Sequence, residues 1–197
     1  MNSNWYKIFL KINKVKYGSN LLLKGTPFIY AKKGSAITIG KDCTIKSSFL
    51  SNLVGLYQRT IIVTRVPGAV IEIGDGVGIS GATIYARKGI FIGENTCIGG
   101  NVKILDNDFH PVEVEKRNAL LSGKAPESGE KADWIGTKEI HIGKNCFIGC
   151  NAIILKGTVL GDGCVVGAGA VVSGKFEAGS VIVGNPGKII KQIGRVK

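Results

Sequence analysis

The amino-acid sequence predicts an all-β solenoid, a parallel β-helix in which short strands alternate with tight corners. Over residues 142–172 an aliphatic residue returns at every sixth position, glycine follows most of these residues, and a second interior-compatible residue stands two positions earlier. A period of six fits neither an α-helix nor a half-buried strand, and it is typical of hexapeptide β-helices. The aliphatic positions are Ile142, Ile148, Ile154, Leu160, Val166 and Val172, and the earlier ones are Ile140, Cys146, Ala152, Thr158, Cys164 and Ala170.

Composition favours the same architecture. The chain has 197 residues, which suits one domain, and it contains 29 glycines but only 7% aromatic residues. Its five cysteines form no C-x-x-C pair, so a zinc site is not expected. Cys43, Cys146 and Cys164 fall at inward positions of the repeat, where cysteine acts as a small hydrophobe. We therefore expect a reduced, cytoplasmic protein.

The net charge of +12 favours anionic partners. A phosphorylated cofactor, an acidic sugar and an anionic membrane surface are all open at this point. The sequence carries no helix-turn-helix, zinc-finger or RNA-binding signature, so no nucleic-acid partner is expected.

Residues 1–20 form the predicted N-terminal cap. Residues 2–17 carry Trp5, Ile8, Phe9, Ile12 and Val15 among four lysines, the pattern of a basic amphipathic helix. Such a helix can cover the open end of a solenoid. The more specific interpretation is a peripheral contact of residues 1–17 with an anionic membrane. The lysines interrupt any signal-peptide core, and no segment is long and apolar enough to span a bilayer.

The solenoid domain is predicted over residues 21–193. Its coils start irregularly at residues 21–46, and residues 47–69 interrupt the repeat as a loop or as irregular strands. Tyr57, Gln58 and Arg59 either contact an acceptor there or belong to a solvated connection or a subunit contact. Regular coils resume over residues 70–104, with a one-residue slip near Lys88.

A long insert is predicted over residues 105–138, where the six-residue phase disappears. Its second half is polar and rich in Gly and Pro, which indicates a mobile surface loop, and long loops on rigid scaffolds often carry function. After the last coils the chain turns at Pro186. We expect a short helix over residues 188–193 and a tail over residues 194–197.

The insert begins with the candidate catalytic residues. If this segment is extended, Asp106, Asp108 and His110 lie on one side of it, because side chains alternate along a strand. A carboxylate beside an imidazole orients the ring and stabilises its charged form, as a general base requires. Which aspartate partners His110 stays open, and a metal site is the weaker interpretation because catalytic zinc draws mostly on histidine. His141 should face outward without a role.

Four segments carry a resemblance to a known family: GISGATIYA (78–86), FIGENTCIGGNVKILDNDFHPV (91–112), IHIGKNCFIGCNAIILKGTVLGDGCVVGAGAVV (140–172) and VGNPGKIIKQI (183–193). The chain resembles the hexapeptide-repeat acyltransferases, in particular the branch of maltose, galactoside and polysaccharide O-acetyltransferases. The resemblance implies a left-handed coil, acetyl-CoA as cosubstrate without a required metal, and a homotrimer whose active sites lie between subunits.

The resemblance also implies individual roles. His110 matches the catalytic base that deprotonates a sugar hydroxyl. Cys150 and Ala168 match corner positions along the pantetheine arm, and Phe147 stands where many relatives have tryptophan. The remaining positions matched to acetyl-CoA binding are Ser80, Ser173, Gly174, Lys188 and Lys191, with Gly174 standing where relatives have lysine.

The expected function is O-acetyl transfer from acetyl-CoA to a sugar hydroxyl, with the acceptor in a surface polysaccharide or its lipid-linked precursor. An N-acetyltransferase acting on an amino-sugar nucleotide, or a serine or xenobiotic acetyltransferase, is the alternative on the same fold. A γ-type carbonic anhydrase needs three histidine ligands, and this chain has two histidines. A non-catalytic scaffold would leave the long insert unexplained.

Overall fold

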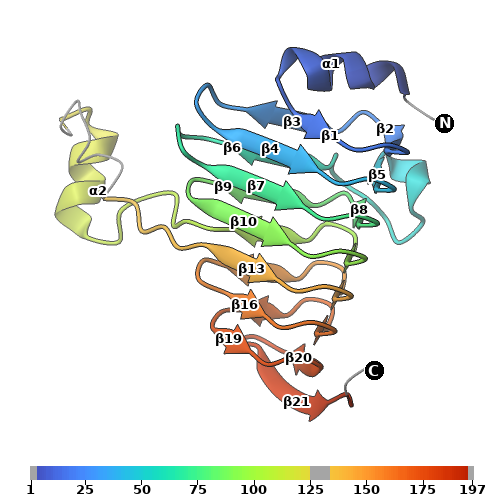
Figure 1. Cartoon of the computed structure of the whole chain (residues 1–197). Coiled ribbons are helices and arrows are strands. Elements are labelled where there is room, and N and C mark those ends of the chain that lie inside the picture. The colour runs from blue at the N-terminus through green and yellow to red at the C-terminus, as the bar shows by residue number, and fades with distance from the viewer. Residues whose placement is uncertain (1–3, 125–133, 195–197) are drawn as a thin grey trace.

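The computed structural model describes residues 4–124 and 134–194 as a three-sided prism of short strands (Figure 1). We number its walls as sheets 1, 2 and 3, in the order in which the chain visits them, and name each corner by the sheets it joins. Within the described residues every pairing between strands is parallel except that of β20 with β21. The predicted all-β solenoid is therefore confirmed.

The strands are short and follow one another around the prism. Sheet 1 contains β1 (Lys16–Tyr17), β4 (Ala36–Ile39), β7 (Val70–Ile73), β10 (Gly89–Ile92), β13 (Ile140–Ile142), β16 (Val159–Leu160) and β19 (Lys175–Phe176). Sheet 2 contains β2 (Leu22–Gly25), β5 (Thr44–Ser47), β8 (Gly78–Ser80), β11 (Cys97–Ile98), β14 (Phe147–Ile148), β17 (Val165–Val166), β20 (Ser180–Val183) and β21 (Lys188–Gln192). Sheet 3 contains β3 (Phe28–Ala31), β6 (Ile61–Thr64), β9 (Thr83–Ala86), β12 (Lys103–Leu105), β15 (Ile153–Leu155) and β18 (Val171–Val172).

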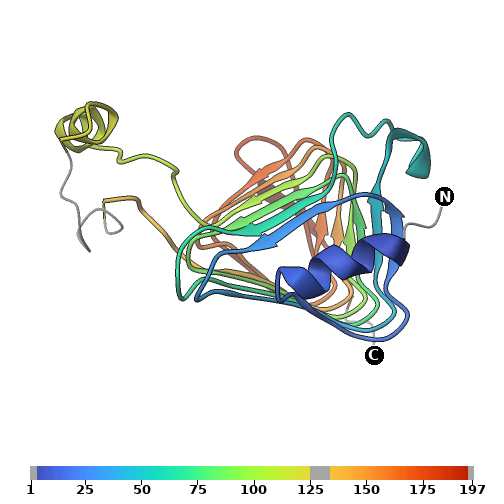
Figure 2. The ribbon, with the colours of Figure 1, turned by 90° about the horizontal axis from the view of Figure 1, so that it is seen from above.

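The hand of the coil follows from the two perpendicular views. The strands of sheet 1 run from left to right at the front, those of sheet 3 return behind them, and successive coils descend from the N-terminus (Figures 1 and 2). This path is a left-handed spiral, as the resemblance implies and opposite to the usual hand of β-crossovers.

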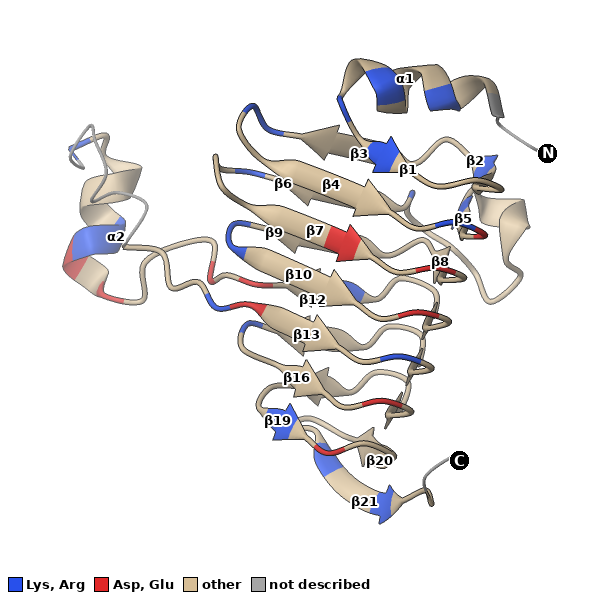
Figure 3. Cartoon of the chain, in the orientation of Figure 1, with Lys and Arg blue, Asp and Glu red and all other residues tan. Residues whose placement is uncertain are grey.

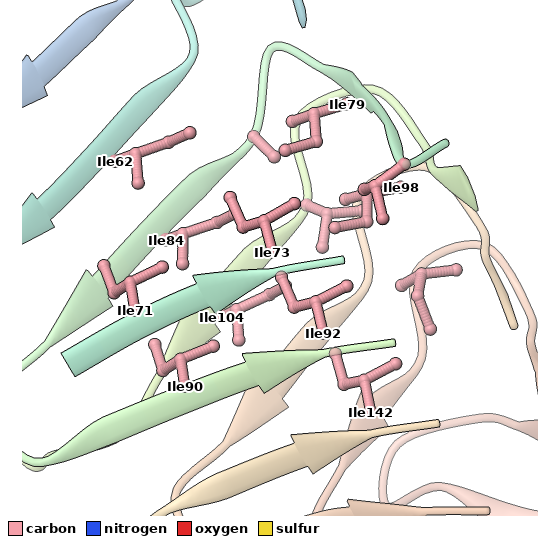
Figure 4. Close-up of a cluster of buried hydrophobic side chains, with 14 of the residues drawn as sticks. Ile62, Ile71, Ile73, Ile79, Ile84, Ile90, Ile92, Ile98, Ile104 and Ile142 are labelled. Carbon is pink, nitrogen blue, oxygen red and sulfur yellow. The ribbon is translucent and has the colours of Figure 1, made fainter. Parts of the chain in front are cut away.

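Stacked isoleucines fill the interior. Ile71 pairs with Ile90, which pairs with Ile140, and Ile73 pairs with Ile92, which pairs with Ile142 (Figure 4). Each of these side chains is buried, and full burial of an isoleucine contributes about 1.5–3 kcal/mol. The predicted inward positions from Ile140 to Val172 are all buried, so the six-residue interpretation holds. The predicted slip is visible in the pairing of Ile73 with Ile92, nineteen positions later.

The N-terminal helix lies over the first coils. A 3₁₀ turn (η1, Asn4–Tyr6) leads into α1 (Lys7–Ile12), which is shorter than the predicted helix over residues 2–17. Leu10 and Val15 enter the core, whereas Trp5 and Ile12 keep 64% and 69% of their surface exposed. The helix thus covers the end of the prism with one face and presents apolar side chains to solvent with another.

Two excursions leave the prism at different corners. A loop at the 2–3 corner contains η2 (Phe49–Ser51) and returns to sheet 3 through β6, so part of the interruption at residues 47–69 is a regular strand. The long insert leaves at the 3–1 corner and contains α2 (Val114–Leu121) (Figure 2). The part of the predicted polar loop at residues 125–133 lies outside the described residues. The coils resume in register, since Lys103 pairs with Ile153.

The predicted C-terminal helix is wrong, because residues 188–192 form β21. β20 ends sheet 2 and would leave its outer row of backbone groups unpaired, and β21 folds back antiparallel to satisfy them. Residues 195–197 of the predicted tail lie outside the described residues. No helix in the described part of the chain is long and apolar enough to cross a membrane.

Candidate active site

A buried carboxylate organises the 3–1 corner at the start of the insert. Asp106 is 0% exposed, and its carboxylate accepts hydrogen bonds from the backbone N–H groups of Arg87, Lys88 and Gly89 at 2.6–3.0 Å. The Asn107 amide donates a further bond of 3.0 Å. Asp106 therefore ties the insert to the preceding corner, and these bonds occupy the carboxylate that the sequence offered as a partner for His110.

The chain after Asp106 is not extended, so the condition for placing three side chains on one face fails. Phe109 has a φ of 62°, in the left-handed region, and its N–H donates to the Asn107 side chain at 2.9 Å. Asp108 forms an ion pair with Lys156 from the next coil. Asp106 and Asp108 thus face different partners, and neither carboxylate is hydrogen-bonded to the ring of His110.

His110 is held by its backbone while its ring stays free. Its N–H donates to the Asp108 carbonyl at 2.7 Å. The preceding Phe109 ring packs against Tyr85 with centroids 4.8 Å apart, and the following Pro111 carbonyl accepts a bond from Arg117. The side chain is exposed, and its ring forms no hydrogen bond within residues 4–124 and 134–194. The turn therefore presents an available imidazole at a fixed place.

The 2–3 corner carries the second group of candidates. Cys150 is partly exposed and Ala168 is exposed, whereas Ser80, two coils above Cys150, keeps only 8% of its surface. The η2 loop causes this difference, because Leu56 lies against Gly81 and Gly100. The Tyr57 hydroxyl donates to the Asn151 side chain at 2.9 Å. The part of the 2–3 corner that the η2 loop covers therefore ends beside Cys150. The corner is open from Cys150 toward the C-terminal coils.

The η2 loop itself borders a hollow of about 530 Å³. Its lining includes Tyr57, Gln58 and Arg59 together with Trp5 and Phe49. Gln58 also donates to the Gly81 carbonyl and the Thr83 hydroxyl, so the loop is fastened to the prism.

One protomer does not bring all the candidates together. The strand β12 runs from the 2–3 corner to the 3–1 corner, so Cys150 and Ala168 lie at one edge of sheet 3 and His110 at the other. Ser173 and Gly174 share the 3–1 corner with His110. Phe147 lies on the outer face of sheet 2, and Lys188 and Lys191 lie on the exposed strand β21.

The outer face of sheet 3 separates the two corners and is mostly apolar. Along the strands of sheet 3, inward side chains alternate with outward ones. Of the outward residues, Phe28 and Leu155 are exposed. The remaining outward residues include Tyr30, Ile61, Tyr85, Leu105, Ile153 and Val171.

Lys103 is the charged residue on this face, and sequence reasoning missed it. Its ammonium donates to the Gln58 side chain and to the Thr83 hydroxyl, and burial lowers the pKa of the amine below its usual value. Lys156 was missed as well, because it stands 48 positions after Asp108 in the sequence and nothing local marks their contact.

Comparisons with known proteins agree with this fold. Residues 139–173 match the family model described as "Hexapeptide repeat of succinyl-transferase". A Dictyostelium discoideum protein with an inferred acetyltransferase activity is 43% identical over 121 residues, and the match covers 57% of this chain and 56% of that relative. The chain thus spans little more than half the length of this curated relative.

Solved structures give the same result. AntD, an N-acyltransferase of Bacillus cereus in complex with dTDP and 3-hydroxybutyryl-CoA, superposes with a TM-score of 0.68 and 20% identity, covering 98% of this chain and 90% of AntD. A galactoside acetyltransferase in complex with coenzyme A superposes with a TM-score of 0.55 and 21% identity, covering 96% and 72%. Repeat, coil and structural likeness agree, and the chain is a hexapeptide-repeat protein with the fold of the CoA-dependent acyltransferases.

Proposed function

We propose that the protein transfers an acetyl group from acetyl-CoA to a sugar hydroxyl, with His110 as the general base. The observation that carries this proposal is the placement of His110. A buried carboxylate and an ion pair fix the turn that bears it, while the imidazole itself is exposed and free of hydrogen bonds within the described residues. A positioned histidine of this kind contributes about 10²–10⁴-fold to proton transfer.

The complete site is proposed to form between two protomers of a homotrimer. Sheet 3 carries one half-site at each edge and an outer face too apolar to favour solvent. Burying these faces around a threefold axis would bring the His110 corner of one protomer to the 2–3 corner of the next. A closed ring uses the same heterologous contact three times, so each pocket receives both halves.

The residues at the 2–3 corner fit coenzyme A. The space beside the Gly169 Cα is open for 4 Å where a side chain would stand, and the neighbouring Ala168 is exposed, so an extended pantetheine arm has room there. Lys188 and Lys191 lie farther along and form no ion pair within the described residues, as suits a nucleotide carrying several phosphate charges. When bound, acetyl-CoA supplies the thioester carbonyl that the acceptor attacks.

The chemistry assigned to His110 is a proton relay. One ring nitrogen accepts the proton of the sugar hydroxyl as its oxygen forms the new C–O bond. The C–S bond breaks, and the imidazolium returns the proton to the departing sulfur, so the ring ends as it began. Cys150 lines the corner in this scheme and does not carry the acyl group.

A second candidate is N-acylation of an amino-sugar nucleotide. The specific observation is the AntD complex with dTDP, whose fold covers 98% of this chain. The same His110 would then deprotonate an ammonium or the attacking amine. Serine and xenobiotic acceptors belong to the same test.

We also propose a place for the protein at the cytoplasmic face of the membrane, where lipid-linked precursors of surface polysaccharides are modified. The support is α1, with exposed Trp5, Ile8, Phe9 and Ile12 beside its lysines. Apolar side chains that enter the lipid interface and cations that meet anionic headgroups bind membranes together.

The test is release of free thiol from acetyl-CoA in the presence of sugars, amino-sugar nucleotides, serine and hydroxyl-bearing xenobiotics. O-acetylation requires release with a hydroxyl acceptor and a base-labile ester in the product. Release only with the amino-sugar nucleotide would select N-acylation. No release with any acceptor would reject the proposal.

A further inference from the structure

Cationic residues recur along one corner of the prism. The ribbon is blue at successive 3–1 corners, with red where the insert leaves and returns, whereas red and blue alternate along the opposite 1–2 corner (Figure 3). Each of the six successive 3–1 corners before β4, β7, β10, β13, β16 and β19 has at least one Lys or Arg in it or directly after it. We call these residues the basic ladder: Lys32, Lys33, Arg65, Arg87, Lys88, Lys138, Lys156 and Lys175.

Most of the ladder lacks carboxylate partners. Among the described residues Lys156 is its only member in an ion pair, with Asp108. Three carboxylates lie near this corner, and their partners are backbone amides for Asp106, Lys156 for Asp108 and His141 for Glu139. The guanidinium Nε of Arg87 is buried without any hydrogen bond in the described structure. The ladder therefore has positive charge left for a ligand.

The opposite corner behaves differently. Its carboxylates are Asp42, Asp75, Glu94, Asp162 and Glu177, and its lysines pair with two of them, Lys41 with Asp75 and Lys144 with Glu94. The 3–1 corner thus holds eight of the chain's 26 Lys and Arg residues along one edge, and seven of the eight form no ion pair among the described residues.

The backbone fixes the spacing of the ladder. The N–H of Lys32 donates to the Thr64 hydroxyl at 3.2 Å, and the N–H of Arg65 donates to the Ala86 carbonyl at 3.0 Å. Neighbouring strands in a sheet lie about 4.8 Å apart, so five steps between six corners span about 24 Å. Positive charges at regular intervals along one straight edge complement a linear polyanion.

We propose that the basic ladder binds an acidic glycan chain lengthwise, so that the acceptor is a polyanionic polysaccharide rather than a neutral sugar. The reactive hydroxyl would lie at His110, which leaves the prism from the same corner between Lys88 and Lys156. This identification of the glycan as acceptor rests on the proposed function, whereas binding at the ladder does not.

The length of the ladder distinguishes this ligand from others. Coenzyme A carries its phosphates together at one end and would meet only a few of the six corners. Single-stranded nucleic acid is usually held by aromatic platforms beside the cations, and Phe109, at this corner, already packs on Tyr85. A chain of uronic acids is bound by cations together with hydrogen-bonding groups, and the 3–1 corner supplies both along the ladder.

The test measures binding of a fluorescent oligogalacturonate without acetyl-CoA, at two salt concentrations. A triple variant, Lys32→Gln, Lys33→Gln and Arg65→Gln, should weaken binding about tenfold or more and reduce its salt dependence. The matched control is Lys7→Gln, Lys11→Gln and Lys14→Gln, which removes the same charge from α1 and should leave binding unchanged. Arg65→Glu alone serves if the triple variant does not fold.

Three results would overturn the proposal: oligogalacturonate binding no tighter than neutral maltohexaose, equal losses in the ladder and control variants, or tighter binding of oligothymidylate, which would assign the ladder to nucleic acid. Thiol release is scored separately. If oligogalacturonate binds the ladder but no sugar releases thiol, the acetyltransferase proposal fails and the binding site stands. If only neutral sugars support turnover, the acidic acceptor is rejected and the enzyme stands.

Discussion

The Asp108 carboxylate and the Lys156 ammonium form an ion pair between successive 3–1 corners. The backbone carbonyl of Asp108 accepts the N–H of His110, so this pair holds the turn that carries the proposed base. Lys156 does not need to touch substrate for this purpose, and we regard it as a positioning residue.

Replacing Lys156 should therefore change turnover more than binding. We expect Lys156→Met to lower kcat about tenfold or more, because displacement of a base by a fraction of an ångström is costly. Asp108→Asn should have a similar effect, and the double variant should lose little more than either single one. Lys156→Arg should restore most activity, and the control is Lys144→Met, which removes the ion pair with Glu94 on the opposite 1–2 corner. A rise in KM with unchanged kcat would argue against positioning.

His110→Asn should reduce thiol release by about 10²–10⁴-fold, because no general base remains to take the hydroxyl proton. Coenzyme A binding, measured by calorimetry, and the oligomeric state should be unchanged. His141→Asn is the matched control, since that ring stacks on Phe91 at 4.7 Å on the outer face of sheet 1. Full activity of the His110 variant would remove the proposed mechanism.

Asp106→Asn should lower the free energy of unfolding by about 2–3 kcal/mol. An amide oxygen replaces a charged acceptor of three backbone N–H groups, and the amide nitrogen brings a donor against them. Chemical denaturation measures the change. Asp162→Asn is the control, because that exposed carboxylate accepts the Lys144 N–H on the far corner and should contribute much less. Equal losses of unfolding free energy in the two variants would show that Asp106 contributes no more to stability than an exposed aspartate.

The period of six was enough to predict the solenoid, because each inward aliphatic position depends only on its place in a coil. The contacts at His110 could not be read in this way. Asp106 binds amides 17 to 19 residues earlier in the chain and Asp108 binds a lysine from the following coil, and both contacts depend on how coils stack. The assumption of an extended segment failed at Phe109, whose positive φ has no marker in the sequence.

The C-terminal strand shows a second limit. The apolar spacing of Ile189, Ile190 and Ile193 suits a helix turn, but a local pattern cannot reveal that sheet 2 has an unpaired edge nearby. Tertiary hydrogen bonding overrode the local preference. The same holds for Lys103, whose position on an apolar face becomes visible only when the sheets are assembled.

Leu155→Glu should disrupt the proposed trimer. Leu155 lies outward on sheet 3, and a carboxylate there would be buried against a neighbouring apolar face without a partner. Light scattering should show a shift toward monomers, together with loss of thiol release. Val159→Glu places the same charge on the outer face of sheet 1 and should leave the assembly intact. A trimer that survives Leu155→Glu would locate the contact elsewhere.

Trp5→Ser with Phe9→Ser should release the protein from membranes. Both rings are exposed on α1, and together with its lysines they are expected to enter the interface of vesicles rich in phosphatidylserine. Co-sedimentation should fall several-fold, while phosphatidylcholine vesicles should bind little of either form. The ladder variant of Lys32, Lys33 and Arg65 is the control for charge alone. Undiminished sedimentation of the Trp5 and Phe9 variant would exclude this role for α1.

The in-register return of the chain at β15 separates the evolution of the scaffold from that of its reactive turn. Because Ile104 and Ile154 stack directly although they stand fifty positions apart in the sequence, the excursion between them can change in length without shifting the register of β12 on β15. Under the proposed function, related spirals would acquire new acceptors by replacing one tethered segment, while the corner proposed to bind acetyl-CoA stayed as it was. Chimeras made by exchanging residues 107–137 between such proteins would use that modularity directly.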